Sequence, residues 1–200
     1  MSTARGQRRA FDRDEALGVA MTHFWRYGYE ATSIASLTQA MGINPPSLYA
    51  AFGNKRQLFT EALQLYVGTH GAYGAAALAE PTARAAVERL LRSAAAAYTA
   101  PDCPPGCLII NGAGTYAPAS EDVKAELRAV RDGTKRAMER RIAADVASGL
   151  LPADTDAAGL ATFYAAVLQG MCTQACDGVG RGELDRMADV ALAAWPGGAG

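Results

Sequence analysis

The stretch GINPPSLYAAFGNK, residues 42–55, places two adjacent prolines directly before a run of residues with helical character. Proline is tolerated in the first turn of a helix because the backbone N–H groups there have no intrahelical partner. Asn44 is a good N-cap residue, so Pro45 and Pro46 fall at the first two helical positions. The stretch therefore predicts a short helix from Asn44 to Phe52 with a sharply defined start.

Two helices are predicted before this one. The first covers residues 12–28, where an aspartate N-cap with a glutamate three residues later precedes a continuous apolar face. Thr32 or Ser33 caps a second short helix that ends at Met41, and Gly42 makes the turn. Two short helices joined at a glycine, behind a packed first helix, have the arrangement of a helix-turn-helix unit.

The composition of the whole chain favours helices. Of its 200 residues, 50% are apolar and 20% are charged, and no long run alternates apolar and polar residues. We therefore predict an all-α protein with about nine helices. The region 69–81 is interpreted as a frayed or bent continuation of a helix, and residues 197–200 as a disordered end. The remaining helices are expected over residues 54–68, 82–98, 120–148, 155–176 and 183–195, with a short one within 107–117.

The formal net charge is only −1, but the charge is unevenly distributed. Residues 1–60 carry seven Lys or Arg and four acidic residues, whereas the rest carries twelve against sixteen. A basic front, with a flexible arm over residues 1–10, favours a polyanionic partner. No apolar run reaches the roughly 18 to 20 residues of a membrane span, and the N-terminus lacks a signal peptide. We expect a cytoplasmic protein with reduced cysteines and no membrane partner.

The sequence does not predict an enzyme. It has two histidines, His23 and His70, and lacks the G-x-S-x-G, P-loop, H-E-x-x-H and G-x-G-x-x-G motifs. No cofactor is expected. A ligand-binding helical protein without operator-specific DNA binding remains the alternative to a DNA-binding regulator.

The segments FWRYGYEATS, LTQAMGI and SLYAAFGNK follow one another within residues 11–63. In this order and spacing they resemble the DNA-binding domain of TetR-type transcriptional regulators. GYEATS, PPSLYAAFG and PGCLI together resemble the branch of that family that includes ComR- and NemR-like regulators. The resemblance implies a repressor that is released from its operator by a small-molecule or reactive effector.

The resemblance also implies a division of the chain and a set of partners. Residues 1–54 would form the N-terminal arm and the helix-turn-helix domain, and residues 55–196 the effector-binding and dimerisation domain. The last two long helices would form the interface of a homodimer. Each N-terminal domain would then read one half of a palindromic operator in double-stranded DNA.

The residues expected at the DNA follow from the resemblance by position. Ala50 and Ala51 stand where many family members carry histidine or another polar residue. DNA shape, methyl contacts and the arm from Arg5 to Arg13 would therefore carry more of the specificity. The contacts expected from the start of the second helix, from the third helix and from the residue that opens the fourth are Thr32, Ser33, Asn44, Pro45, Ser47, Tyr49 and Lys55.

The effector pocket is expected among aromatic and polar residues beyond the fourth helix. Each candidate is, by base rate, more often a packing residue than a ligand contact. The candidates are Tyr66, His70, Tyr73, Tyr98, Cys107, Asn111, Tyr116, Phe163 and Tyr164.

The four cysteines form two pairs with a spacing of four residues. Cys107 lies where a loop enters a predicted helix, and the N–H groups of a helix N-terminus lower the pKa of a thiol. Cys107 is therefore the favoured thiol sensor, with Cys103 as its resolving thiol. Cys172 and Cys176 fall on one face of an apolar helix. A thiol sensor, a metal site and plain packing remain open for both pairs, although no metal is assigned.

Overall fold

The computed structural model describes residues 11–112 and 120–197, and within these ranges the chain forms ten helices and no strand. The prediction of an all-α protein is confirmed, with one helix more than expected. The expected N-terminal arm (residues 1–10), the candidate Tyr116 and the last three residues (198–200) lie outside the described residues.

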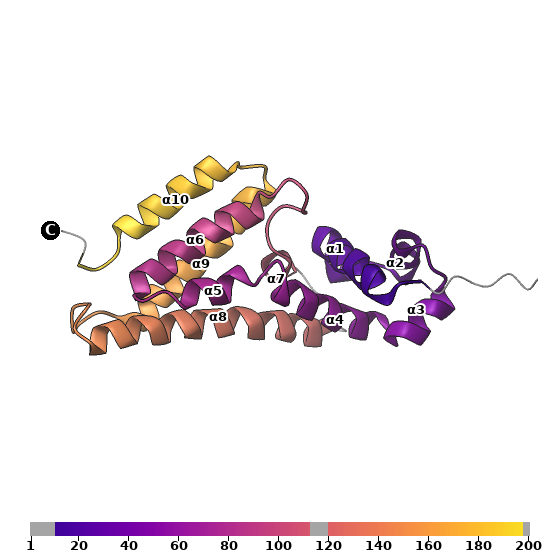
Figure 1. The fold of residues 1–200 in the computed structure, drawn as a ribbon, viewed down its shortest axis with the longest axis horizontal. Helices are drawn as coiled ribbons and strands as arrows, with labels where there is room; N and C mark the ends of the chain where they lie inside the picture. Colours follow the sequence, from indigo (N-terminus) through magenta and orange to yellow (C-terminus); the bar gives the residue numbers. More distant parts are fainter. Residues whose placement is uncertain (1–10, 113–119, 198–200) are drawn as a thin grey trace, which may run out of the picture.

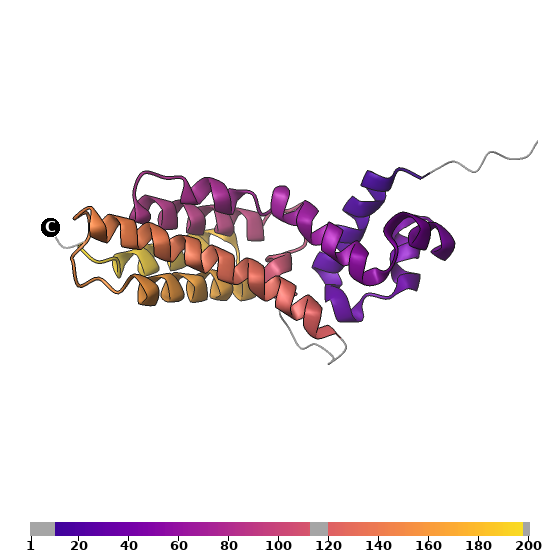
Figure 2. The same ribbon diagram turned by 90° about the horizontal axis from the view of Figure 1, so that it is seen from below.

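The molecule is elongated, with the first three helices at one end and the long helices at the other (Figure 1). The fourth helix runs between the two ends, and the eighth extends along the larger part toward it (Figure 2). The helices are α1 (Arg13–Ala31), α2 (Ile34–Met41), α3 (Pro45–Phe52), α4 (Lys55–Gly68), α5 (Tyr73–Leu78), α6 (Ala83–Tyr98), α7 (Leu108–Asn111), α8 (Glu121–Ala147), α9 (Ala157–Cys176) and α10 (Arg181–Ala193).

The predicted starts of the short helices are confirmed. The Asn44 side chain accepts a hydrogen bond from the backbone N–H of Ser47 at 2.9 Å, and the two prolines occupy the first two positions of α3. Ser33 caps α2 in a capping box with Ser36. Gly42 ends α2 with a φ of 65°, a left-handed conformation that glycine adopts without strain. Side-chain caps and one glycine therefore fix the turn between α2 and α3.

Two boundaries differ from the prediction by more than two residues. Gly28 interrupts α1 with a φ of 75°, but one further turn follows it, so α1 ends at Ala31. Residues 69–81 contain a separate short helix, α5, and are not a bent continuation of α4. The reason is a tight turn after α4, in which the Gly71 N–H donates to the Tyr66 carbonyl at 2.8 Å.

The core of the N-terminal part lies between α1 and α4. Phe24 of α1 and Phe59 of α4 are fully buried, and their ring centroids are 5.1 Å apart at an interplanar angle of 89°. Such edge-to-face aromatic pairs add to the stabilisation from buried apolar area. The ring pair fixes α1 to α4. A movement of α4 would therefore be transmitted through α1 to the helix-turn-helix unit.

A buried carboxylate joins the ends of α6 and α8. Asp145 is only 4% exposed, and its side chain accepts a hydrogen bond at 2.6 Å from the N–H of Ala83 in the first turn of α6. Arg141, one turn earlier on α8, approaches the same carboxylate at 3.9 Å and donates to the Glu80 carbonyl at 2.8 Å. The start of α6 is thus fixed to the last turns of α8. Among the described helices none is long and apolar enough to cross a membrane.

Candidate nucleic-acid interface and internal cavity

The third helix has a buried rear and an exposed front. Leu48 and Phe52 are 0% and 3% exposed and pack into the core. On the opposite side Asn44 and Pro45 are exposed, and Tyr49 is 49% exposed. An α-helix with a free face and a rigid rear can enter the major groove of DNA, which is about 12 Å wide.

Two polar residues at the start of α2 differ in their accessibility. Thr32 is 1% exposed, and its hydroxyl donates to the Gly28 carbonyl at 2.6 Å, so this hydroxyl is not presented at the surface. Ser33 is exposed and accepts from the Ser36 N–H at 3.0 Å. The surface near α2 thus presents Ser33, while Thr32 closes the end of α1. Ser47 on α3 is half-buried.

Lys55 opens α4 beside this surface. Its ammonium lies 4.1 Å from the ring centroid of Tyr29, a cation–π contact, and the side chain is half-buried. Burial lowers the pKa of Lys55, and the carboxylate of Glu30 opposes this effect. The contact positions a cation at the N-terminus of a helix, where backbone N–H groups also favour an anion.

Two other arginines of the basic front bind within the molecule. Arg13 donates to the Ala51 carbonyl at 3.3 Å and pairs with Glu61 at 2.6 Å, so it belongs to the folded domain and not to a free arm. Arg56 pairs with Asp122 and, at 2.7 Å, with Glu126 of α8. These partners lie far away in sequence, so a count of charges over residues 1–60 does not reveal that the two arginines are already paired.

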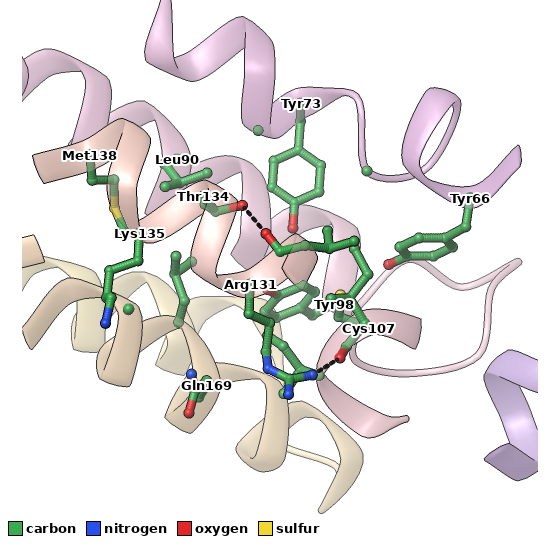
Figure 3. A pocket seen from close by; sticks show the side chains of 17 residues that line it. Tyr66, Tyr73, Leu90, Tyr98, Cys107, Arg131, Thr134, Lys135, Met138 and Gln169 are labelled. Carbon is green, nitrogen blue, oxygen red and sulfur yellow. Dashed lines mark hydrogen bonds between the residues drawn. The ribbon is translucent and has the colours of Figure 1, made fainter. Parts of the chain in front are cut away.

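A cavity of about 100 Å³ lies among α4 to α9 (Figure 3). None of its lining residues belongs to α1, α2 or α3. Four of the predicted pocket residues line it, namely Tyr66, Tyr73, Tyr98 and Cys107. Sequence reasoning missed its polar residues on α8 and α9, because they look like solvated positions on long helices. The further lining residues are Gly71, Gly74, Leu90, Ile109, Ile110, Val130, Arg131, Thr134, Lys135, Met138, Ala165, Leu168 and Gln169.

Four predicted pocket residues lie outside this cavity. Phe163 is 43% exposed on the outer side of α9, and the buried Tyr164 donates its hydroxyl to the Ala191 carbonyl at 3.0 Å. The side chain of Asn111 donates to the Pro105 carbonyl at 3.2 Å. His70 meets Trp25 edge-on, with 5.1 Å between ring centroids. Another packing or hydrogen-bonding contact therefore holds Tyr164, Asn111 and His70, while Phe163 is exposed.

The environment of Cys107 is the opposite of the one predicted. The side chain is 5% exposed, and burial raises the pKa of the thiol. The hydroxyl of Tyr66 and the N–H groups of Ile109 and Ile110 act in the other direction by hydrogen bonding, but they do not outweigh burial. The expectation of a lowered pKa was wrong because α7 has only four residues and its N-terminus is desolvated.

The other thiols have contacts of their own. Cys172 Sγ accepts from the N–H of Cys107 at 3.2 Å and donates to Asn111 Oδ1 at 3.1 Å, and burial raises its pKa. Cys176 is exposed and lies 3.4 Å from the same Asn111 oxygen. The half-buried Cys103 has its Sγ 3.8 Å from His70 Nδ1. No group of three or more metal-binding side chains occurs within the described ranges.

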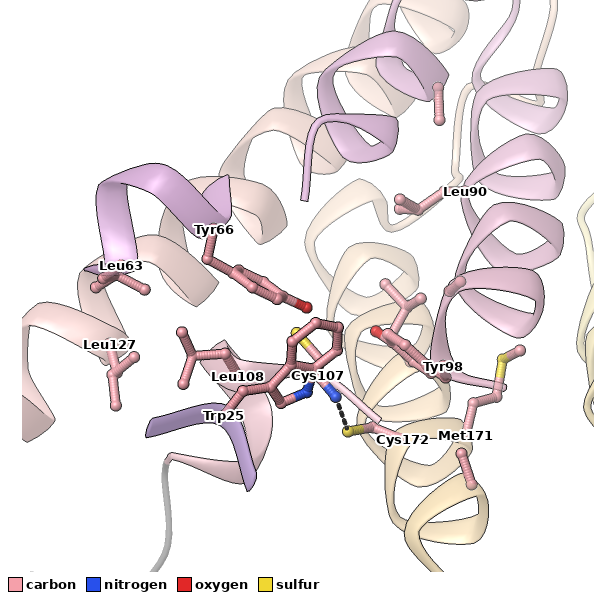
Figure 4. Packing of buried hydrophobic residues seen from close by; sticks show 14 of the residues in the cluster. Trp25, Leu63, Tyr66, Leu90, Tyr98, Cys107, Leu108, Leu127, Met171 and Cys172 are labelled. Carbon is pink, nitrogen blue, oxygen red and sulfur yellow. Dashed lines mark hydrogen bonds between the residues drawn. The ribbon is translucent and has the colours of Figure 1, made fainter. Parts of the chain in front are cut away.

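A chain of contacts joins the cavity to the N-terminal helices (Figure 4). Tyr66 and Cys107 both line the cavity, and the Tyr66 hydroxyl acts to lower the pKa of the Cys107 thiol. The ring of Tyr66 meets Trp25 of α1 edge-on, with 4.9 Å between centroids. Both aromatic residues are at most 4% exposed. A change at the cavity wall can therefore reach α1 through direct packing.

The exposed front of α3, the fixed α2–α3 turn and the separate cavity define a helix-turn-helix DNA-binding protein with a ligand-binding part. The family model described as "Bacterial regulatory proteins, tetR family" matches residues 16–62. The model described as "Tetracyclin repressor-like, C-terminal domain" matches residues 82–176.

Individual relatives match between 61% and 96% of the chain. The HTH-type transcriptional repressor ComR of Escherichia coli (strain K12) is 35% identical over 195 residues, which cover 96% of this chain and 93% of ComR. The repressor BdcR of the same organism is 37% identical over 124 residues, covering 61% of this chain and 62% of BdcR. A cysteine mutant of the TetR family transcriptional regulator CifR, solved with a 26-bp double-strand operator DNA, is 49% identical with a TM-score of 0.90; the match covers 96% of this chain and 100% of that chain. The chain belongs to the TetR family of bacterial transcriptional regulators.

Proposed function

We propose that this protein is a dimeric, cytoplasmic repressor that leaves its operator when the cavity is occupied, and that it acts by binding without catalysis. The proposal depends on the two faces of α3, one exposed and one buried in the core. The cavity lies in the other part of the molecule, away from α3. The names of its relatives support repression, and the CifR complex supports operator binding. In this proposal residues 1–54 bind DNA and residues 55–196 bind the effector and the second subunit.

The proposed interface with DNA contains one side-chain contact fewer than the sequence predicted, because the Thr32 hydroxyl is excluded. Asn44, Pro45, Ser47 and Tyr49 on α3 approach the bases and nearby backbone, while Ser33 and Lys55 contact phosphates on either side. The exposure of the front of α3 supports the first group, and the helix N-termini support the second. Thr32 contributes through its position at the end of α1 and not through its hydroxyl.

A footprint on the DNA upstream of the gene tests this reading. A dimer that places one α3 in each half-site is expected to protect a palindrome with half-site centres about 34–36 Å apart, one helical turn. Protection of a single, unrepeated site would contradict binding by a symmetric dimer.

Lys55→Ala is expected to weaken binding to all DNA sequences by a similar factor, because a phosphate contact carries no base information. Loss of one phosphate contact should reduce the slope of log K against log salt concentration by about one unit. Titrations between low and moderate salt measure this slope. A slope equal to that of the wild type would remove Lys55 from the interface and leave it as a partner of Tyr29 alone.

The dimer interface is proposed on α9 and α10. Phe163 and Val190 are 43% and 75% exposed although both are large and apolar, and Val167 and Met187 are only partly covered. Exposed apolar side chains that gather on neighbouring helices are typical of a protein–protein interface.

Phe163→Arg is expected to convert the dimer into a monomer, because a charge at the centre of an apolar interface is desolvated without a partner. Light scattering after size-exclusion chromatography gives the mass. Leu150→Arg is the matched control, since Leu150 is also apolar and is 62% exposed, but lies beyond the end of α8. A dimeric Phe163→Arg protein would place the interface elsewhere.

Release from DNA is proposed to begin at Cys107 and Tyr66. An effector in the cavity, whether it reacts with the thiol or only displaces it, would move the Tyr66 ring against Trp25. The 4.9 Å contact between these rings and the pairing of Arg56 with α8 support this route. The first contact joins the cavity wall to α1, and the second joins α8 to the first turn of α4, which directly follows α3. Through these contacts a bound effector would change the fraction of dimers that can bind DNA.

A further inference from the structure

The charged residues that line the cavity all have the same sign. Arg131 and Lys135, one helical turn apart on α8, are the two charged side chains among its lining residues, and no carboxylate lines it. The facing wall is α9, whose sequence from Ala157 to Cys176 contains no acidic residue. A cleft lined by charges of one sign between apolar walls concentrates ligands of the opposite charge.

Lys135 is half-buried, and no ion pair neutralises it within the part of the chain that the structure describes. The described residues provide it with no ion pair, whereas Arg128 and Arg141 on the same helix approach Asp132 and Asp145 at 3.4 and 3.9 Å. Removing a charge from water without pairing it is costly, so a half-buried lysine beside a cavity gains from an anionic ligand.

The second cation is held in place beside α7, the short helix that Cys107 caps. Arg131 donates to the Ile109 carbonyl at 2.8 Å, which fixes the guanidinium next to α7. In Figure 3 Lys135 and Gln169 lie toward one end of the cavity and Tyr66 and Cys107 toward the other, with the Arg131 guanidinium between them. The cavity therefore has Lys135 at one end, a thiol and tyrosine hydroxyls at the other, and a second cation between them.

We propose that the effector cavity selects small anionic molecules, such as carboxylates with a short apolar body, through Lys135 and Arg131. The inference rests on the proposed function only in taking this cavity as the effector site. A bound anion is placed with its charge toward α8 and its other end toward Cys107 and Tyr66.

Two alkylating reagents of nearly equal size test the charge preference directly. Iodoacetate is an anion and iodoacetamide is neutral, and both react in the same way. The Cys107 sulfur forms a bond to the CH₂ carbon, the carbon–iodine bond breaks, iodide leaves, and the thiol proton passes to water. Both need the same thiolate, so the ratio of the two rates is independent of the thiol pKa.

The rate ratio of iodoacetate to iodoacetamide at Cys107, resolved by mass spectrometry, is expected to be about three to ten times higher in the folded protein than in urea. This range corresponds to one incompletely screened charge interaction. Lys135→Gln should reduce the ratio by about threefold. Arg136→Gln is the matched control, because Arg136 is exposed on the same helix and does not line the cavity, and it should leave the ratio unchanged.

The inference would be overturned if the iodoacetate-to-iodoacetamide rate ratio in the folded protein were equal to or below the ratio in urea. Equal effects of Lys135→Gln and Arg136→Gln on this ratio would also overturn it. Failure of both reagents to reach Cys107 in the folded protein would also overturn it, because the cavity would then not admit a small molecule. The proposed function has a separate readout. If iodoacetamide still releases the protein from DNA while the ratio is unchanged, repression and release stand and only the preference for anions is lost.

Discussion

Asp145→Ala is expected to lower the free energy of unfolding by about 2 to 4 kcal/mol, the range for removing one partner of a buried, charge-assisted hydrogen bond. The carboxylate is 4% exposed and accepts the Ala83 N–H at 2.6 Å. Its removal leaves that N–H without an acceptor and deprives Arg141 of its nearby carboxylate. Urea denaturation at equal protomer concentration measures the effect, since the stability of an oligomer depends on concentration.

Asp154→Ala is the matched control for this substitution. Asp154 is an exposed aspartate in the loop that follows α8, and its replacement should change the free energy of unfolding by no more than about 0.5 kcal/mol. If Asp145→Ala changed the free energy of unfolding by as little as the control does, the connection between α6 and α8 would not depend on the carboxylate.

Cys107→Ser is expected to remain on its operator when a quinone or an unsaturated aldehyde releases the wild type. A serine hydroxyl is not ionised near neutral pH and does not replace the thiolate as a nucleophile. At least about tenfold more reagent should be needed for half-release in an operator gel shift. Cys176→Ser, which removes the exposed thiol at the end of α9, should respond like the wild type. Equal release of wild type and Cys107→Ser would make Cys107 a packing residue.

The same thiol should show a distinct pH dependence. Burial raises the pKa of Cys107, so less of it is thiolate at pH 7 than for an ordinary cysteine, whose pKa is about 8.5. The rate of its alkylation by iodoacetamide is therefore expected to keep rising with pH above about 8.5. A rate that levels off below about pH 8 would mean that the Tyr66 hydroxyl and the α7 N–H groups outweigh burial.

Local sequence patterns predicted the DNA-binding end of the molecule well. The Asn44 cap, the two prolines and Gly42 act over a few residues, and all three appear in the structure as expected. The division of α3 into a buried Leu48 side and an exposed Tyr49 side follows from helical spacing alone. Such features depend on neighbours in sequence, which a single chain displays directly.

The cavity could be predicted only in part, because its walls come from helices far apart in sequence. Aromatic residues and the Cys107 stretch indicated four lining residues, but Lys135 and Arg131 resemble ordinary charged positions on a long helix. The direction of the pKa shift of Cys107 was also predicted wrongly, since the pKa is raised and not lowered. A loop that enters a helix usually exposes its first residue, whereas here tertiary packing buries it at 5% exposure. Burial of this kind is set by α4, α6 and α9 and not by local sequence.

The most direct test of the central claim is a comparison of affinities for two DNA duplexes. Fluorescence anisotropy at physiological salt would measure binding to the DNA upstream of the gene and to a scrambled duplex of equal length. Specific readout by two α3 helices predicts a ratio of at least about 10³ in favour of the upstream DNA. Tyr49→Ala should weaken that binding while the protein stays dimeric and folded. Equal affinity for both duplexes would contradict an operator-binding regulator and favour a ligand-binding protein whose helix-turn-helix does not read sequence.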